Sequence, residues 1–195
     1  MDGVERTLSA EVHVLFNGYV GSHVASTVSF VRDGDARVII DPGMVPDPTA
    51  ILKPLVALGE SADSITDVIF SHHHPDHTLN AALFTNARFH DYWAIYKGDT
   101  WQDRPAEGFQ LSPAIQLIET PGHTPQDITT LVSTRDGVVA FTHLWWSADG
   151  PQEDPLAADL TQLHINRQRV LAIGQLRLIV PAHGAPFTPG ETTPR

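Results

Sequence analysis

The stretch that decides the fold reads SHHHPDH and covers residues 71–77. It places four histidines and one carboxylate close together, and both kinds of side chain bind metals. Successive side chains of an extended segment alternate between two faces, so His72 and His74 point the same way while His73 points away. Pro75 favours an extended conformation for His74. This spacing predicts a metal site.

The same segment can supply ligands to a second metal. If a helix begins just after Pro75, Asp76 and His77 lie at its N-terminus and turn toward a position close to the first metal. A polyhistidine tag is the alternative interpretation of three consecutive histidines. This run is internal, follows the apolar residues 68–70 and precedes an acid and a fourth histidine, and these features argue against a tag.

Two more histidines follow strand-like runs further along the chain. His123 lies in the segment TPGHTP after the apolar run 115–118, and His183 lies in the segment VPAHG after the run 178–180. Turns that directly follow a strand hold their side chains rigidly. We therefore expect both histidines to complete the metal site.

Together these motifs resemble the metallo-beta-lactamase superfamily, whose signature is His-x-His-x-Asp-His followed by isolated histidines at strand ends. The resemblance covers nearly the whole chain, and the segment 41–43, Asp-Pro-Gly, is similar to the family's Asp-x-Gly turn. The segments 121–127 and 180–187 are most similar to the metallo-beta-lactamase domain-containing protein 1 group of animals and its bacterial relatives.

The resemblance implies two sets of metal ligands. One metal is held by His72, His74 and His123, and another by Asp76, His77 and His183. We expect the cofactor to be zinc, as one or two ions. Iron and manganese remain alternatives, because imidazole ligands suit them as well and the spacing does not decide among the metals.

One position departs from the family pattern. Family members usually carry Gly-Asp where this chain reads Thr142-His143, so His143 replaces the aspartate that bridges the two metals. A carboxylate offers two oxygens, whereas a neutral imidazole offers one free nitrogen and serves one metal. We expect His143 to be a ligand and the second site to be weakened. The alternative is a histidine that is hydrogen-bonded and binds no metal.

The expected reaction is hydrolysis by a metal-bound hydroxide of an ester, lactone, thioester or related bond. A zinc ion lowers the pKa of its bound water to roughly 7. Asp76 and His143 are the predicted catalytic residues, and the resemblance implies that Asp76 orients the nucleophile and passes a proton to the leaving group. Asp41 is a candidate partner that fixes the tautomer of a ligand histidine, or a cap for its own turn.

Alternating strand and helix patterns indicate a mixed α/β (α+β) fold, and the resemblance implies a four-layer αββα sandwich. Strands are predicted over 12–16, 27–31, 37–40, 67–70, 115–118, 128–133, 138–141 and 178–180. Helices are predicted over 47–58, over 77–83, and from a cap at Asp154 to about residue 173. The fold would place all the ligands at one rim.

Composition is typical of a compact enzyme. The 195 residues, 42% of them hydrophobic, predict a single domain over 1–195. No run of about 18 apolar residues and no export signal is found, so we expect a cytoplasmic protein without membrane contact. The chain has no cysteine, which excludes disulfides and thiolate ligands. A formal charge of −11 disfavours nucleic acid, although a metal pair can hold a phosphodiester.

Aromatic residues near the ligands indicate how substrate is bound. Trp145 and Trp146 follow His143 directly, and we expect at least one of them to line a pocket for a small-molecule substrate. The alternative is that they pack in the core or in the interface of a homodimer. Only a short segment follows His183, so the family's larger C-terminal and inserted domains are not expected.

Two other classes of function stay open. An iron-dependent oxidoreductase of the same fold would use the histidines with His143 idle. A non-hydrolytic binding protein would keep the metal and the pocket, the change at His143 having removed activity. Bound iron with oxygen consumption would indicate the first class, and a metal-loaded protein that hydrolyses nothing would indicate the second.

Overall fold

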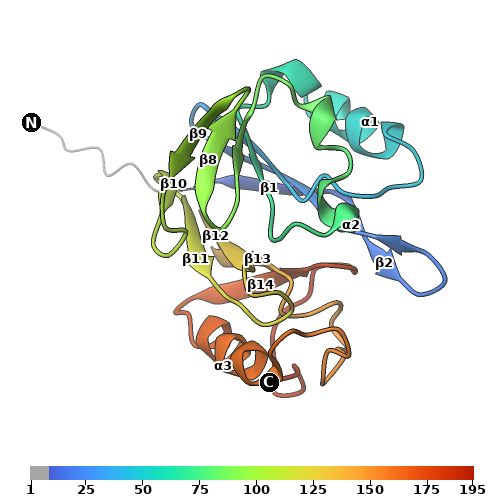
Figure 1. Ribbon diagram of the computed structural model, residues 1–195, viewed down its shortest axis with the longest axis vertical. Helices are drawn as coiled ribbons and strands as arrows, with labels where there is room; N and C mark the ends of the chain where they lie inside the picture. Colours follow the sequence, from blue (N-terminus) through green and yellow to red (C-terminus); the bar gives the residue numbers. More distant parts are fainter. Residues whose placement is uncertain (1–8) are drawn as a thin grey trace, which may run out of the picture.

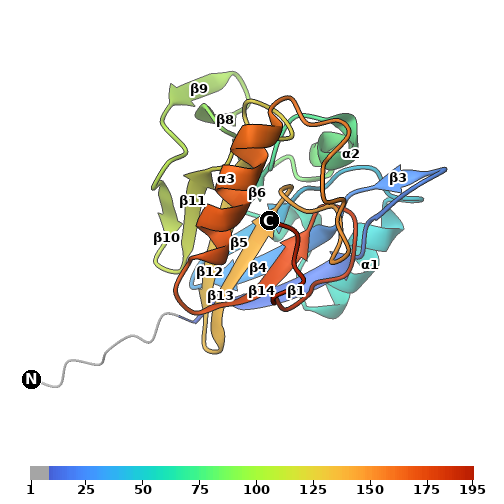
Figure 2. The same cartoon turned by 90° about the horizontal axis from the view of Figure 1, so that it is seen from below.

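The computed structural model describes residues 9–195, so the first eight residues of the expected domain lie outside the described residues. Two β-sheets face each other and helices cover their outer surfaces (Figure 1, Figure 2). The chain crosses from the first sheet to the second between β9 (Thr100–Asp103) and β10 (Gln110–Ser112), so the N-terminal and C-terminal halves form separate layers. The expected αββα sandwich is confirmed.

The first sheet contains seven strands in the order β1-β4-β5-β6-β7-β8-β9. Their bounds are β1 (Glu11–Phe16), β4 (Val28–Asp33), β5 (Ala36–Ile40), β6 (Asp67–Ile69), β7 (Arg88–His90), β8 (Ala94–Lys97) and β9 (Thr100–Asp103). The second sheet contains β10 (Gln110–Ser112), β11 (Ile115–Glu119), β12 (Ile128–Thr134), β13 (Gly137–Thr142) and β14 (Leu176–Pro181) in sequence order. A separate hairpin pairs β2 (Tyr19–Val20) with β3 (Val24–Ala25).

The helices are α1 (Thr49–Ala57), α2 (Pro75–Thr78) and α3 (Leu160–Leu171), with 3₁₀ turns at Ala62–Ser64 and Ala81–Leu83. The alternation of side chains along each strand divides the core into layers. In β5, Val38 and Ile40 face the second sheet, whereas Ile39 packs on the α1 side. On the outer face of the second sheet, Ala140 and Ile179 pack with Leu163 and Val170 of α3.

Strand direction brings the predicted ligands to one rim. β5 and β6 are parallel, so the turn at Asp41 and the segment 71–77 leave the first sheet at the same edge. β13 and β14 are also parallel and end with Thr142 opposite Pro181, which places His143 beside the segment that carries His183. The antiparallel pair β11 and β12 ends with Glu119 opposite Ile128, so the loop 120–127 lies at this rim too.

Several features of the fold differ from the sequence prediction. The single helix predicted over 77–83 is instead the short helix α2, which ends at Thr78, followed by the 3₁₀ turn Ala81–Leu83. The hairpin β2–β3 and the strands β7 to β10 were not predicted, because they are short. Helix α3 begins at Leu160 instead of just after Asp154, since the side chain of Asp159 accepts the hydrogen bond from the backbone N–H of Gln162 and caps the helix.

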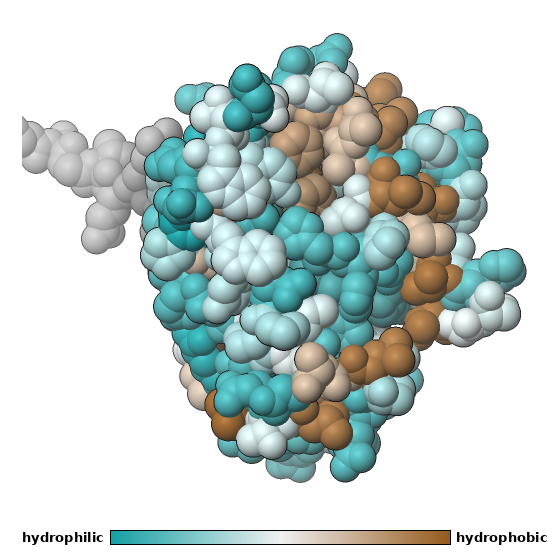
Figure 3. All heavy atoms as spheres, viewed as in Figure 1, coloured by the Kyte–Doolittle hydropathy of each residue, from teal (hydrophilic) through white to brown (hydrophobic). Residues whose placement is uncertain are grey.

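The surface is mainly hydrophilic on the face shown in Figure 3, and hydrophobic residues gather over the region of α1, α2 and the β2–β3 hairpin. In the part of the chain that the structure describes, no helix combines the length and the apolar character needed to cross a membrane.

Candidate metal centre

Three histidine rings meet at the rim with their nitrogens facing one another. The Nε2 atom of His72 lies 2.9 Å from Nδ1 of His74, and Nε2 of His123 lies 3.1 Å from the same atom. His72 and His74 come from the loop after β6, and His123 comes from the loop between β11 and β12. These are the three residues predicted to bind the first metal. Their role as ligands stays a prediction.

The outward-facing nitrogens of two of these rings are held by hydrogen bonds. Nδ1 of His72 lies 3.1 Å from the hydroxyl of Ser71, and Nδ1 of His123 lies 2.8 Å from a carboxylate oxygen of Asp154. Burial alone raises the pKa of Asp154, but hydrogen bonds from His123 and the backbone outweigh it and lower the pKa. An ionised carboxylate only accepts, so Nδ1 of His123 donates, and in the neutral ring Nε2 is left as a bare acceptor.

This arrangement fits a metal cation. If both His72 and His123 present bare Nε2 lone pairs to His74, one proton on Nδ1 of His74 can satisfy only one of them. A cation among the three nitrogens satisfies all of them. Imidazole nitrogens bind zinc, copper, iron and nickel, so the chemistry of the donors agrees with the expected cofactor without naming the metal.

The second predicted set lies next to the first. An Asp76 carboxylate oxygen is 3.4 Å from Nε2 of His77 and 3.6 Å from Nε2 of His183. The Nε2 atom of His77 is buried and has no hydrogen-bond partner among the described residues. A buried polar atom without a partner is costly, and a bound cation would remove that cost. These three residues therefore also fit a metal.

Hydrogen bonds at the Nδ1 atoms orient both histidines of the second set. Nδ1 of His77 donates to Oδ2 of Asp41 at 2.9 Å, and Nδ1 of His183 donates to the backbone carbonyl of Ala25 at 3.0 Å. In the neutral ring, each bond fixes the tautomer that leaves Nε2 free to face Asp76. Asp41 thus occupies the position expected of a residue that orients a ligand, while its Oδ1 accepts from the backbone N–H of Ser71.

The turn at residues 41–43 is shaped by close packing against the metal segment. Asp41 has a φ of 52°, in the left-handed region that aspartate tolerates better than most residues. At Gly43 a Cβ atom would lie 1.6 Å from the backbone oxygen of Asp76, so only glycine fits. This contact holds the start of α2, and with it Asp76, against the turn.

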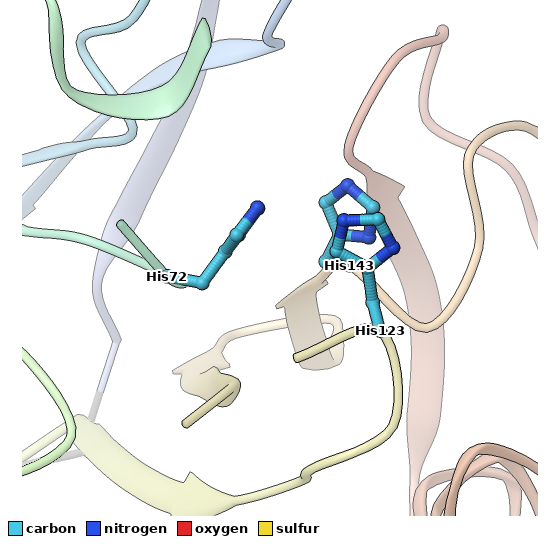
Figure 4. Close-up of side chains that lie close together, drawn as sticks. All are labelled: His72, His123 and His143. Atoms are coloured by element: carbon cyan, nitrogen blue, oxygen red, sulfur yellow. The ribbon is translucent and has the colours of Figure 1, made fainter. Parts of the chain in front are cut away.

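His143 lies between the two sets. One of its nitrogens groups with those of His72 and His123, and one groups with those of His77 and His183, all within 4.8 Å of one another in each group. Figure 4 shows the rings of His123 and His143 side by side and facing the ring of His72. Nδ1 of His143 is buried without a hydrogen-bond partner among the described residues. If His143 bound no metal, this buried nitrogen would have no partner among the described residues.

Burial sets the charge of these rings. Desolvation, followed by repulsion from neighbouring histidines, holds the pKa of His72 and of His143 well below the ordinary value. Burial also lowers the pKa of His77, but the Asp41 carboxylate outweighs it and raises that pKa. His72 and His143 are therefore neutral at physiological pH, which is the form that binds metals.

The structure corrects the role predicted for Asp154. Instead of capping a helix, its carboxylate accepts hydrogen bonds from Nδ1 of His123, Nε1 of Trp146 and the backbone N–H of Leu156. Sequence reasoning missed this function because Asp154 and His123 lie 31 positions apart in the sequence. The dipeptide Asp-Pro is a common helix start, and no local signal distinguishes the two roles.

Replacing Asp154 with Asn is expected to weaken zinc binding at the first set about 10–100-fold, the usual cost of losing a partner of a ligand histidine. The physical reason is that an amide no longer enforces the Nδ1–H tautomer of His123. Zinc affinity is measured by competition with a chelator. Asp67→Asn is the matched control, because Asp67 is a buried carboxylate bonded to His90 at 2.8 Å outside the cluster. Equal losses in both variants would contradict the assigned role.

The structure also corrects the prediction for Trp145. Its side chain is fully buried in the cluster beneath α3, and Nε1 donates to the carbonyl of Pro194 at 2.8 Å, so it lines no pocket. Trp146 is half-buried, and its ring centroid lies 6.2 Å from that of His183. Because Trp145 is excluded by its burial, only Trp146 remains a candidate for the substrate wall.

Trp145→Ala is expected to lower the free energy of unfolding by about 3–5 kcal/mol, the usual cost of removing a large buried aromatic side chain. Chemical denaturation measures this loss. Trp93→Ala is the control, because that ring is 48% exposed and its removal leaves no internal cavity. A change in the Michaelis constant without a loss of stability would return Trp145 to the pocket.

Comparison with known proteins places these features in a family. The family model described as "Metallo-beta-lactamase superfamily" matches residues 22–152. Metallo-beta-lactamase domain-containing protein 1 of Xenopus laevis is 30% identical over 194 residues, covering 90% of this chain and 80% of the frog protein. The chain spans 49% to 62% of the length of four further curated relatives, which include the human protein of the same name.

Solved structures share the fold. A Thermotoga maritima protein described as a metallo-beta-lactamase candidate aligns with a TM-score of 0.72 and 26% identity, covering 93% of this chain and 100% of that one. The dizinc quorum-quenching lactonase AidC aligns with a TM-score of 0.60 and 20% identity, covering 81% of this chain and 72% of that one, which shows the fold alone.

Proposed function

This chain belongs to the metallo-beta-lactamase superfamily, and we propose that it is a metal-dependent hydrolase that cleaves an ester, lactone, thioester or related bond of a small molecule. The observation that carries the proposal is the convergence at one rim of two sets of side chains that can bind metals. One set is His72, His74 and His123, and the other is Asp76, His77 and His183. AidC, which shares the fold, is described as a dizinc lactonase.

A bound zinc or comparable dication lowers the pKa of water to about 7 and polarises a carbonyl oxygen. The chain's own residues would do the remaining work. Asp41, Asp154 and the carbonyl of Ala25 hold three ligand rings in the tautomers that leave their inner nitrogens free. Asp76 lies between His77 and His183 with its carboxylate at the rim, where it can hold the proton destined for the leaving group.

A cleft of about 400 Å³ next to the second set offers a place for the substrate. Of its lining residues, Met44 donates its N–H to the backbone carbonyl of Asp76, and Val24 precedes Ala25, whose carbonyl accepts from His183. Tyr19, which lines the cleft, presents an aromatic side chain that is 39% exposed. We propose that the substrate carries an apolar group that packs here. The cleft is lined by Tyr19, Gly21, Ser22, His23, Val24, Met44, Val45 and Pro46.

A substrate panel paired with metal analysis tests the proposal. Protein purified without added metal is analysed for bound elements and assayed against esters, lactones, thioesters and phosphodiesters, with oxygen consumption recorded in parallel. We expect hydrolysis that a chelator abolishes and zinc restores. Bound iron with oxygen consumption would replace the proposal with an oxidoreductase. A metal-loaded protein inactive on the whole panel would favour a binding protein.

A further inference from the structure

Arg167 on α3 is a fully buried cation that the proposed reaction does not use. Its guanidinium donates three hydrogen bonds to backbone carbonyls, from Nε to Leu144 at 2.8 Å, from Nη2 to Pro151 at 2.9 Å and from Nη1 to Gln152. The guanidinium carbon also lies 5.8 Å from the centre of the Trp145 ring. No carboxylate forms an ion pair with it in the described part of the chain.

The three carbonyls belong to the segment that links two parts of the candidate metal centre. Leu144 directly follows His143, and Gln152 lies two residues before Asp154. Asp154 holds Nδ1 of His123. The buried guanidinium therefore fixes both ends of the segment 144–154. One end carries the histidine between the two ligand sets, and the other carries the carboxylate behind the first set.

The same helix holds the turn that carries His123. The side-chain amide of Asn166 donates to the carbonyl of Pro121 at 2.7 Å. At Gly122 a Cβ atom would lie 2.7 Å from the Cα atom of Leu163, so the turn sits directly on the helix. Asn166 thus holds the turn that carries His123, and the adjacent Arg167 holds the segment that contains Asp154. The two segments meet where Asp154 accepts the hydrogen bond from His123.

We propose that Arg167 is a positioning residue for the candidate metal centre, acting through the segment 144–154 to hold Asp154 against His123. A planar guanidinium with several fixed donors can satisfy three carbonyls at once, whereas an ammonium is a single point charge. Loss of these bonds frees the segment, and Asp154 then no longer enforces one tautomer of His123. The ligand set comes from the proposed function, but the positioning role concerns the fold of the metal-free protein.

The tautomer of His123 in metal-free protein is the first readout. Long-range ¹⁵N–¹H NMR spectra at pH 8, where an ordinary histidine is neutral, report which ring nitrogen carries the proton. In the native protein we expect His123 to be protonated at Nδ1 alone. In Arg167→Met we expect a mixture of both tautomers. This measurement needs neither metal nor substrate, so it stands or falls independently of hydrolysis.

Zinc affinity is the second readout. Arg167→Met is expected to weaken the first zinc equivalent about 10-fold or more, in the range found when a partner of a ligand histidine is lost. Val170→Ala is the matched control, because Val170 is a fully buried residue on the same helix whose apolar side chain donates no hydrogen bond to these carbonyls. It should reduce stability while leaving the tautomer and the affinity unchanged.

Rescue separates positioning from a general loss of structure. In Arg167→Ala, millimolar methylguanidinium is expected to restore the single tautomer and most of the zinc affinity, whereas methylammonium is not. If Arg167→Met does not fold, Arg167→Lys keeps the buried charge and should show the same mixture of tautomers. A native tautomer in the Met or Lys variant, or equal effects of Val170→Ala, would overturn the proposal.

Discussion

Alanine in place of His72, His74 or His123 is expected to abolish high-affinity metal binding at the first set and to remove hydrolytic activity. Nε2 of His72 and Nε2 of His123 lie 2.9 Å and 3.1 Å from Nδ1 of His74, so each ring supplies one of three converging nitrogens. Losing only the hydrogen-bond partner of a ligand histidine usually lowers metal affinity or activity about 10–100-fold. Losing the ring itself should therefore reduce kcat/KM by more than about 100-fold. Elemental analysis and steady-state kinetics measure the two effects.

His73→Ala is the internal control for this experiment. The His73 side chain is 38% exposed and its Nε2 lies 3.1 Å from Asp91, away from the cluster. Its ring also stacks on Trp93 at a centroid distance of 5.8 Å. Metal content near that of the native protein is therefore expected. If His73→Ala lost metal while His74→Ala kept it, the assignment of the two faces of this loop would be wrong.

The native protein is expected to hold one metal tightly and a second weakly or not at all, and His143→Asp to raise the affinity of the second. His143 is neutral and lies between the two sets, where it screens two dications from each other less than a carboxylate would. An imidazole nitrogen serves one metal, whereas the two oxygens of an aspartate can serve two. Isothermal titration of the metal-free protein with zinc measures both equivalents.

His143→Asn separates charge from shape in that titration. Asparagine has nearly the shape of aspartate but carries no charge, so only the Asp variant should tighten the second equivalent. Two equally tight zinc equivalents in the native protein, unchanged by His143→Asp, would contradict the expectation of one tight and one weak site. His143 would then be a competent ligand for its own metal or irrelevant to metal number.

Much of the candidate centre follows from local sequence patterns. The alternation of faces in an extended segment separates His73 from its neighbours, and the pattern of apolar runs followed by turns predicts that His123 and His183 leave strands at one rim. The same reasoning, helped by the family resemblance, gives the αββα sandwich. Such patterns work because they depend on the local backbone and on residue type, both of which the sequence states directly.

Contacts between distant segments could not be predicted in this way. Asp154 caps no helix, because the chain continues to Asp159 before α3 begins and the freed carboxylate meets His123. Trp145 faces the core instead of the cleft, since its orientation is set by the end of β13 and the packing of α3. Each of these outcomes depends on which elements pack together, and no short motif records it.

Residue order alone therefore predicts which side chains are candidates to bind a metal and which strand ends carry them. The groups that hold the outer nitrogens of these candidate ligands are visible only once the two sheets and α3 are packed together. Asp154 accepts a hydrogen bond from His123, and the carbonyl of Ala25 accepts one from His183. Arg167 donates to the backbone of the segment that carries Asp154. The physical reason is that a hydrogen bond across the core requires two segments to be placed to within a few tenths of an ångström, and that precision comes from the packing of whole layers.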